Sequence, residues 1–271
     1  MALALLLDIG NTNIKLGIAD RGEISHSFSL PSGRSYTADY LGLLLLQFFG
    51  QAHCPPEKLE TAIACSVVPS LEPILRQACR KYLRQELLLV PQDLPIPLEN
   101  RYEEPSQVGA DRLVAAYAAR RLYADPASII CVDYGTATTF DCVEGQVYLG
   151  GLICPGLFSS AAALSSNTAK LPAVSLEMTD PELTPGRSTS TSINHGFIFG
   201  FAAMTEGLCA RLSKRMAQPC FVLATGGFSS SLSRVMRCFD AVHPELLLEG
   251  LRILYVQAGK EPANSTAGGA A

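Results

Sequence analysis

Apolar and polar positions follow one block pattern that occurs twice along the chain. In each copy a short apolar run meets an Asp-x-Gly-polar-small sequence, and a second apolar stretch follows. Such a pattern predicts a strand, a tight turn and a returning strand. The first copy is Asp8-Ile9-Gly10-Asn11-Thr12 between residues 3–7 and 14–18, and the second is Asp133-Tyr134-Gly135-Thr136-Ala137 between residues 129–132 and 138–143.

Further apolar segments predict a similar plan after each hairpin. The first half is expected to hold a helix at 38–49, a strand at 61–68, a helix at 71–83 and a strand at 86–90. The second half is expected to hold a strand at 147–153, a long helix at 196–216 and a strand at 221–224. Strands followed by helices indicate mixed α/β layers. The repeated hairpin indicates two similar domains that face each other across a cleft.

The Pro-rich segment at residues 91–105 is expected to connect the two halves, and a helix at 108–123 follows it. We expect an N-terminal domain over residues 1–114 and a C-terminal domain over residues 115–244. A last helix at 245–257 should return to pack on the N-terminal domain. The small and polar residues 261–271 predict a disordered tail.

Composition excludes several classes of protein. Of the 271 residues, 48% are hydrophobic and 17% charged, which is typical of a well-buried globule. The net charge is −4 and the basic residues are scattered, so nucleic acid is not an expected partner. The longest apolar run, residues 41–49, is too short to span a bilayer, and the apolar start lacks the basic region of a signal peptide. Nine cysteines without a CxxC pair indicate free thiols, so we expect a cytoplasmic protein with no membrane segment.

The turn at Asp8 to Thr12 has residue types that suit a phosphate. Gly10 lets the backbone fold tightly so that N–H groups converge on an anion, and Asn11 and Thr12 add short donors. Phosphate would repel Asp8 unless a cation lay between them, which favours Mg²⁺ at this carboxylate. One copy alone would fit an ordinary hairpin turn better, since Asp, Gly and Asn are common turn formers. Two copies favour a pair of loops that hold a polyphosphate.

Two other segments carry candidate chemistry. Ala224-Thr225-Gly226-Gly227 follows a predicted strand, and paired glycines there would let a flat ring such as adenine approach the backbone. In Gly109-Ala110-Asp111-Arg112, Asp111 suits a general base for a substrate hydroxyl, with Arg112 binding an anionic group. Asp111 equally suits a capping residue at a helix start. No P-loop or GxGxxG sequence is present, which disfavours those nucleotide folds.

Seven short motifs in series give the chain a resemblance to type III pantothenate kinases. The motifs are DIGNTN at 8–13, GADR at 109–112, DYGTATTFD at 133–141, GGLICPG at 150–156, NTAxLP at 167–172, the 186–196 segment with Thr189, and ATGG at 224–227. The resemblance implies an α/β, duplicated actin/sugar-kinase-like (RNase H-like) fold of two domains with a central cleft. It also implies phosphorylation of pantothenate by ATP with Mg²⁺, the first step towards coenzyme A, by a homodimer that needs a monovalent cation, K⁺ or NH₄⁺.

The resemblance also implies a role for individual residues. Asp111 would be the catalytic base. Pantothenate would contact Tyr102, Gly109, Arg112 and Thr189. Asp133 would hold the monovalent cation and Asp8 the Mg²⁺. The ATP and phosphate set would be Asp8, Gly10, Asn11, Thr12, Asn13, Lys15, Thr136, Ala137, Thr138, Gly226 and Gly227. The family usually has Asn where this chain has Ser188, so Ser188 is left out of the expected site.

Two other functions stay open at this point. A kinase or phosphohydrolase of the same fold, acting on another small substrate, would keep both hairpins but would not need GADR or the 186–196 segment. A non-catalytic regulator would need none of Asp8, Asp111 and Asp133, so their joint presence favours the kinase.

Overall fold

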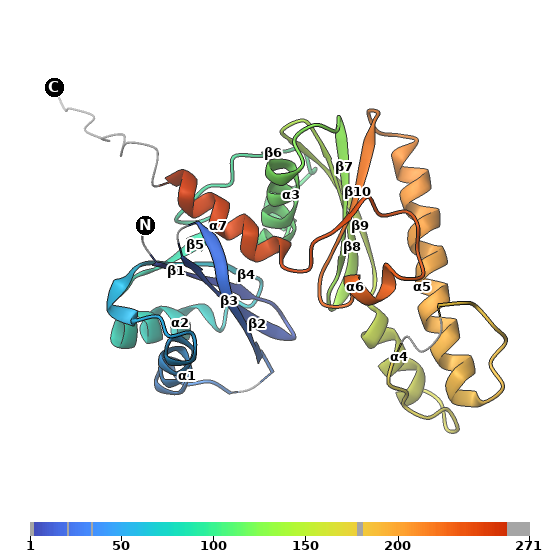
Figure 1. The fold of residues 1–271 in the computed structure, drawn as a ribbon, viewed down its shortest axis with the longest axis horizontal. Helices are drawn as coiled ribbons and strands as arrows, with labels where there is room; N and C mark the ends of the chain where they lie inside the picture. The colour runs from blue at the N-terminus through green and yellow to red at the C-terminus, as the bar shows by residue number, and fades with distance from the viewer. Residues whose placement is uncertain (1–2, 21, 34, 178–180, 259–271) are drawn as a thin grey trace. The chain divides into compact units, whose positions relative to one another are not determined.

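The computed structural model describes residues 3–20, 22–33, 35–177 and 181–258, and its chain divides into two compact units (Figure 1). Unit 1 comprises Met1–Ile96 together with Leu247–Ala271, and unit 2 comprises Pro97–Leu246. The domain limits expected from the sequence, residues 1–114 and 115–244, stay a prediction. The expected disordered tail at 261–271 lies outside the described residues.

Unit 1 is built on a sheet of five strands in the order β3-β2-β1-β4-β5. Strand β1 pairs antiparallel with β2 and parallel with β4. The strands are β1 (Leu3–Ile9), β2 (Asn13–Asp20), β3 (Glu23–Pro31), β4 (Leu59–Ser66) and β5 (Leu87–Val90). The helices are α1 (Ala38–Gln51), a 3₁₀ turn (Pro56–Lys58), α2 (Glu72–Ala78) with a π-helical turn (Cys79–Leu83), and α7 (Leu246–Ala258).

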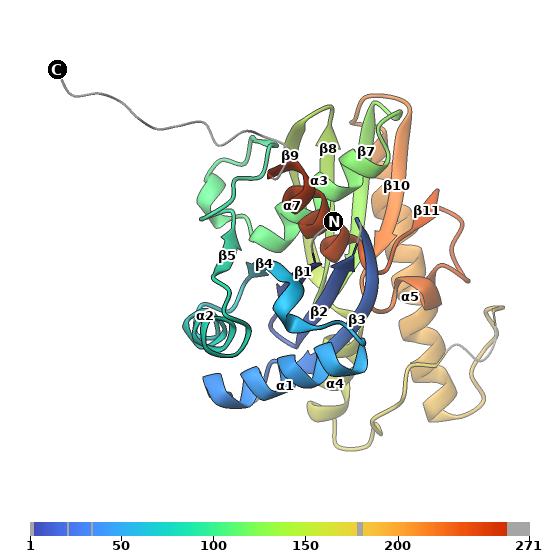
Figure 2. The same cartoon turned by 60° about the vertical axis from the view of Figure 1, so that its left-hand side comes forward.

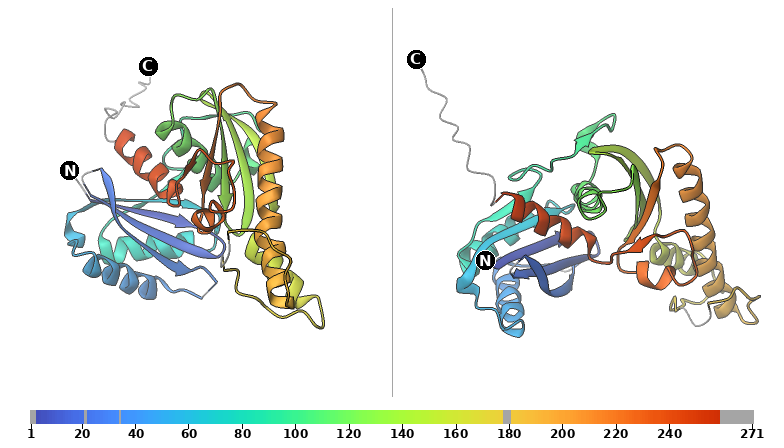
Figure 3. Two further views of the ribbon diagram at one scale, coloured as in Figure 1. Left: turned by 45° about the vertical axis from the view of Figure 1, so that its right-hand side comes forward. Right: turned by 45° about the horizontal axis from the view of Figure 1, so that its top comes forward.

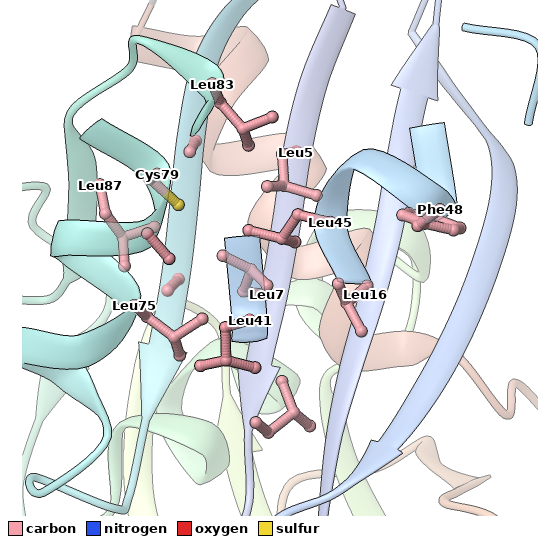
Figure 4. Packing of buried hydrophobic residues seen from close by; sticks show 14 of the residues in the cluster. Leu5, Leu7, Leu16, Leu41, Leu45, Phe48, Leu75, Cys79, Leu83 and Leu87 are labelled. Carbon is pink, nitrogen blue, oxygen red and sulfur yellow. The ribbon is translucent and has the colours of Figure 1, made fainter. Parts of the chain in front are cut away.

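The core of unit 1 lies between its sheet and helices α1 and α2. Alternate residues of β1 point to this side, where Leu5 and Leu7 meet Leu41 and Leu45 of α1 (Figure 4). These α1 residues are one helical turn apart, which places them on one face. Helix α1 begins where the Thr37 side chain accepts a hydrogen bond from the Tyr40 backbone N–H at 3.2 Å. The buried face therefore holds the sheet in a defined position.

Unit 2 has a six-stranded sheet in the order β11-β10-β7-β8-β9-β6. Its strands are β6 (Glu99–Asn100), β7 (Ser128–Tyr134), β8 (Ala137–Glu144), β9 (Val147–Pro155), β10 (Cys220–Thr225) and β11 (Ala241–Val242). Its helices are a 3₁₀ turn (Pro105–Gln107), α3 (Ala110–Leu122), α4 (Leu157–Ser166), α5 (Thr189–Ser213) and α6 (Ser229–Leu232).

Different helices cover the two faces of the unit 2 sheet. On one face Cys131 packs in a cluster with Ala118 of α3. On the other face, Val132 and Phe140 pack in a cluster with Ile198 of α5. Figures 2 and 3 show α5 running along one side of this sheet and α3 lying on the other. Successive residues of β7 and β8 therefore alternate between an α3 face and an α5 face.

The two sheets repeat one plan. The order β3-β2-β1-β4-β5 in unit 1 corresponds to β9-β8-β7-β10-β11 in unit 2, and all four pairings have the same direction in both. Unit 2 adds β6 beside β9. The predicted duplication of the hairpin is confirmed, and it extends to the whole five-stranded sheet.

The structure corrects the start of the long helix. Helix α5 begins at Thr189, seven residues before the predicted start, because Ser188 forms its N-cap. The Ser188 hydroxyl accepts from the Thr191 backbone N–H at 3.2 Å, and the Thr191 hydroxyl accepts from the Ser188 N–H at 3.1 Å. The position where this chain departs from the family pattern therefore caps a helix.

Strand β3 and helix α4 have no counterpart in the sequence-based prediction, and neither do the short elements β6, α6 and β11. Strand β3 is an edge strand whose side chains are mostly exposed, so it lacks the apolar alternation that marks a half-buried strand. Helix α4 is rich in serine and alanine and buries only Leu157. Within the described ranges, no helix has both the length and the apolar character needed to cross a membrane.

Candidate active site

The turns after β7 and β10 meet at the carboxylate of Asp133. Gly226, directly after β10, has a φ of +89°, and a Cβ there would lie 2.3 Å from Asp133 Oδ1 and 2.7 Å from the Tyr134 carbonyl oxygen. Only glycine permits this approach. A Cβ on Gly135 would lie 3.9 Å from both Asp133 oxygens, whereas Gly227 faces open space. The motifs at 133–141 and 224–227, which are far apart in the sequence, therefore lie next to each other in unit 2.

Asp133 stands in a row of polar residues across the sheet. The strand registers place Thr225 of β10 and Thr139 of β8 on either side of it. Cys131, two residues earlier on β7, packs in the α3 cluster, so Asp133 lies on the α3 face. Oxygen ligands suit hard cations. No group of three His, Cys, Asp or Glu side chains suited to a metal occurs in the described part of the chain, so a cation at Asp133 would take further oxygens from a nucleotide, backbone or water.

The turn between β7 and β8 is held from two sides. Gly135 N–H donates to the Ala137 carbonyl at 3.1 Å, and the Ser159 hydroxyl of α4 donates to the Thr136 carbonyl at 2.9 Å. A Cβ on Gly156 would overlap that same carbonyl oxygen, at 2.0 Å. The glycine that ends the GGLICPG motif therefore lets α4 start against this turn. Thr136 is exposed and Ala137 partly buried.

Thr138 lies differently from its neighbours in the turn. It is fully buried on the same face of β8 as Phe140, which packs toward α5. Its Oγ1 makes no hydrogen bond to a described residue. The hydroxyl thus points into the interior of unit 2, away from the face that carries Asp133.

The GADR motif forms the start of α3. Gly109 is the N-cap, and Asp111 lies in the first turn, where its Oδ1 accepts from the Arg112 backbone N–H at 2.8 Å. Burial raises the pKa of Asp111, and the bond from that N–H and the Arg112 charge oppose the rise. A carboxylate whose pKa is raised accepts a proton more readily. The geometry supports a base, although Asp111 also takes part in the helix start.

The Arg112 side chain enters a buried network on the α3 face. Its Nε donates to Asp141 Oδ1 at 2.8 Å, and its Nη2 lies 2.7 Å from the same oxygen. The Tyr148 hydroxyl donates to Oδ1 at 2.8 Å and the Thr139 hydroxyl to Oδ2 at 3.1 Å. The side chains are 10% exposed for Arg112 and 1% for Asp141. The pair is thus almost fully desolvated.

Nη2 of Arg112 is in contact with Asp141 but makes no hydrogen bond. Its distance is within ion-pair range while its direction is not that of a hydrogen bond, so Nε carries the directional bond and Nη2 contributes attraction of charge. Guanidinium groups bind carboxylates and phosphates through two such nitrogens. Nη2 is itself buried, so both contacts hold the guanidinium against Asp141 of β8.

Two glycines of β9 make room for this network. Gly150 has a φ of +116°, and a Cβ there would lie 3.4 Å from the Tyr102 ring. A Cβ on Gly151 would overlap the Phe140 carbonyl oxygen and lie 3.0 Å from Arg112 Nη2. Strand β6 pairs with β9 just before Tyr102. The GGLICPG motif therefore brings Tyr102 and Arg112 to one part of the sheet.

Thr189 lies elsewhere in unit 2, at the first position of α5. It lines a mostly apolar pocket of about 390 Å³ together with Ser192 and Phe197 of α5, Leu164 of α4, and Leu171. Helix α5 packs on the opposite face of the unit 2 sheet from α3, which carries Asp111 and Arg112. Within one chain, the structure does not bring Thr189 together with the other residues expected to bind pantothenate.

The hairpin of unit 1 repeats the arrangement at Asp133. Asp8 is the sixth residue of β1, as Asp133 is of β7, and its cross-strand neighbour is Lys15. Gly10 N–H donates to the Asn13 carbonyl at 3.0 Å, which closes the turn. Asn11, Thr12 and Asn13 are exposed, Gly10 and Lys15 partly buried. The turn therefore presents short donors to solvent, as a phosphate site requires.

Ser32 holds this turn in place, a role that the sequence analysis missed. Its hydroxyl donates to the Gly10 carbonyl at 2.6 Å and its N–H to the Thr12 carbonyl at 2.8 Å. Asp141 and Tyr148 were missed as well. A signal existed for Asp141, since an Asp between apolar residues of a predicted strand is a buried charge that needs a partner.

Solved structures define the class of protein. A ROK hexokinase from Thermus thermophilus superposes with a TM-score of 0.51 at 13% identity, covering 94% of this chain and 99% of that one. A structure described as a Baf family transcriptional activator, from Campylobacter jejuni, gives a TM-score of 0.59 at 19% identity, covering 95% and 100%. Such low identities show the fold alone, and that fold is the duplicated actin/sugar-kinase-like one, as predicted.

Sequence comparisons define the family. The model of the type III pantothenate kinase family matches residues 4–211. The type III pantothenate kinase of Oleidesulfovibrio alaskensis is 58% identical over 255 residues, which cover 94% of this chain and 97% of that protein. The chain therefore belongs to the type III pantothenate kinase family. The resemblance inferred from seven motifs is confirmed.

Proposed function

We propose that this protein transfers the γ-phosphate of ATP to the terminal hydroxyl of pantothenate. The observation that carries the proposal is the Asp111 carboxylate, half-buried at the start of α3 with its pKa raised by burial, in a chain of the pantothenate kinase family. Phosphoryl transfer needs positioning and neutralisation of charge more than covalent chemistry. One well-placed base with backbone turns for the phosphates meets that need.

In this proposal Asp111 accepts the proton of the pantothenate hydroxyl as the hydroxyl oxygen attacks the γ-phosphorus. The bond between the γ-phosphorus and the bridging oxygen to the β-phosphate breaks, and ADP leaves. The raised pKa of Asp111 brings the carboxylate closer to the basicity that a general base needs. The hydrogen bond from the Arg112 N–H fixes Oδ1. Oδ2 then remains for the substrate hydroxyl.

Arg112 and Tyr102 would bind the other end of pantothenate. The Arg112 guanidinium suits the pantothenate carboxylate, because its permanent charge strengthens hydrogen bonds to an anionic group. Gly109 would contribute backbone at the helix start. These residues share one face of unit 2, which supports a common substrate site.

The two hairpins would bind the ATP phosphates through Gly10, Asn11, Thr12, Asn13 and Lys15 in unit 1 and through Thr136 and Ala137 in unit 2, with Gly226 and Gly227 beside the adenosine. Asp8 would hold Mg²⁺ and Asp133 a monovalent cation, and these ions would neutralise phosphate charge. The absence of a Cβ at Gly226 fits a cation at Asp133, because a Cβ there would lie 2.3 Å from Oδ1 and occupy the space beside the carboxylate. Thr138 contributes through packing, since its side chain is buried.

Thr189 supports the proposal of a homodimer with a shared substrate site. It lines an apolar pocket on α5, and the neighbouring Phe197, Phe199 and Phe201 are only partly buried. Apolar surface of this kind favours a second protein partner. We propose that Thr189 reaches pantothenate in the other subunit of a cytoplasmic homodimer. Sedimentation of an active monomer at micromolar concentration would contradict this.

Release of ADP by the purified protein, with and without pantothenate, tests the proposed activity. We expect release that depends on pantothenate and on Mg²⁺, and that falls when sodium replaces potassium or ammonium. Release without pantothenate would favour a phosphohydrolase. No release at all would favour a non-catalytic regulator.

A further inference from the structure

Asp141 is a buried carboxylate for which the proposed reaction has no role so far. It lies on β8 on the α3 face of the sheet, where its two oxygens accept from Arg112 Nε, Tyr148 Oη and Thr139 Oγ1. Burial raises the pKa of Asp141, and the Arg112 charge with these donors opposes the rise. We take the carboxyl as ionised at neutral pH, because three donors and a permanent cation surround it.

The duplicated sheet shows that the fold itself does not need this carboxylate. Gly17 occupies the equivalent position of β2, two residues after Lys15, as Asp141 lies two residues after Thr139. A Cβ at Gly17 would lie 3.3 Å from a methyl group of Leu248 on α7. Unit 1 thus packs an apolar helix where unit 2 has an ion pair. A buried charge that the scaffold can replace with an apolar contact indicates a functional reason.

We propose that Asp141 is a positioning residue for the phosphoryl transfer: it holds Arg112 by the Nε edge and compensates the Arg112 charge beside Asp111. This inference rests on the proposed function, in which Asp111 is the base and Arg112 binds pantothenate. Compensation of the Arg112 charge matters because Arg112 directly follows Asp111 in the first turn of α3.

The electrostatic consequence has a defined sign. The Arg112 charge lowers the pKa of Asp111, against the rise that burial causes. Among the described residues, Arg112 is the charged side chain that shifts the pKa of Asp111. The pKa of Arg112 is in turn raised by Asp141, Tyr148 and Tyr102. Without the Asp141 charge the guanidinium would act on Asp111 uncompensated. The pKa of Asp111 would fall, and the base would weaken.

The test combines Asp141→Asn, Arg112→Gln and the double variant. The low-pH limb of kcat/KM reports the pKa of the base in the free enzyme. We expect this limb to move about one pH unit lower in Asp141→Asn, since a neighbouring opposite charge shifts the pKa of a carboxyl by about 1–3 units. It should move higher in Arg112→Gln and return toward the wild-type position in the double variant. KM for pantothenate should rise about tenfold in Asp141→Asn as Arg112 loses its fixed orientation.

Asp93→Asn is the matched control. Asp93 of unit 1 also accepts from an arginine, Arg76 at 2.7 Å, and from a backbone N–H, Leu89 at 2.8 Å. The Asp93→Asn variant should lower the free energy of unfolding without moving the low-pH limb of kcat/KM. If Asp141→Asn does not fold, Arg112→Gln and the double variant still decide the matter, because the limb of the double variant must lie below that of Arg112→Gln. Equal limbs in that pair would overturn the proposal, as would an unchanged limb and KM in a folded Asp141→Asn.

Titration of the Asp111 carboxyl carbon by NMR separates this inference from the proposed function. The measurement needs no turnover. A shift of the Asp111 pKa in Asp141→Asn with no pantothenate-dependent ADP release would uphold the charge compensation while refuting the proposed activity. Normal turnover with an unmoved Asp111 titration would refute the role of Asp141.

Discussion

The two units share a scaffold down to the burial of single residues, and they differ at the positions that carry chemistry. Strands β1 and β7 have the same burial sequence, with an Asp at the sixth position of each. Strands β3 and β9 both end in a proline that pairs with the first residue of the returning strand, Asn13 or Ala137. The duplicated sheet therefore supplies two carboxylates in equivalent places.

The differences lie around those carboxylates. Lys15 is the cross-strand neighbour of Asp8, whereas Thr139 is that of Asp133, and the turn of unit 1 is one residue longer. On the sheet, Asp8 thus has the positively charged Lys15 beside it, whereas Asp133 has the hydroxyl-bearing Thr139 and Thr225. Unit 2 alone adds α3 with Asp111 at its start, in front of the duplicated strands. The duplicated sheet therefore supplies equivalent positions for two carboxylates, and the residues next to each carboxylate determine its chemistry.

The largest effect is expected for Asp111→Asn, which removes the proposed base, a residue that only unit 2 carries. A positioned base contributes about 10²–10⁴-fold, and the loose transition state of phosphoryl transfer favours the lower end of that range. Because burial raises the pKa of Asp111, the charged form costs folded-state stability above that pKa. The melting temperature at neutral pH should therefore stay the same or rise.

Measurements of kcat and of melting temperature on purified Asp111→Asn check this together. Near-normal turnover would show that Asp111 only shapes the helix start. In the wild type, kcat/KM should fall with decreasing pH at values above the ordinary range of an Asp, because the base must be ionised to act.

Asp8→Asn and Asp133→Asn form a matched pair that tests the division between the hairpins. Each removes one charge from an equivalent position. We expect Asp8→Asn to raise the Mg²⁺ concentration needed for half-maximal rate roughly tenfold, or about 1.4 kcal/mol. We expect Asp133→Asn to abolish the stimulation by potassium or ammonium. Rates measured across both cation series decide between them. Identical responses of the two variants would contradict the proposed division.

Gly226→Ala should lower stability more than Gly227→Ala. Alanine at φ +89° is strained, and its Cβ would overlap Asp133 Oδ1, so we expect a loss of about 1–3 kcal/mol. Gly227 faces open space and has no positive φ, so its variant should stay within about 0.5 kcal/mol. Denaturant melts of both proteins measure the difference. Equal stabilities would mean that the turn after β10 can move away from Asp133.

The smallest effect is expected for Ser32→Ala and Ser159→Ala, which remove the hydroxyls that hold the two turns. Ser32 donates to Gly10 at 2.6 Å in partly buried surroundings, whereas the bond from Ser159 to Thr136 is exposed. We expect a loss of about 1 kcal/mol for Ser32→Ala and less for Ser159→Ala. The Kd of ATP should rise in the same order. A larger effect at Ser159 would reverse the comparison.

The sequence by itself determined the duplication, the class of fold and the family. These depend on local information: apolar runs of strand length, Gly-containing turns that few residue types can form, and short motifs in a fixed order. For the same reason the hairpins at Asp8 and Asp133 were predictable to within a few residues. Strand β3 and helix α4 were not, because their exposed or small side chains carry no strong periodicity.

The partners of the site residues were decided only by the tertiary structure. Arg112 and Asp141 are 29 residues apart, and nothing local indicates that α3 crosses β8 where the two side chains meet. Gly226 and Asp133 meet only because β10 pairs in parallel with β7. Strand order and register bring such residues together. Both depend on which face of each strand is buried, and this is decided by the packing of the sheet as a whole. The residue types therefore follow from the sequence, but their neighbours depend on the packing of the complete unit.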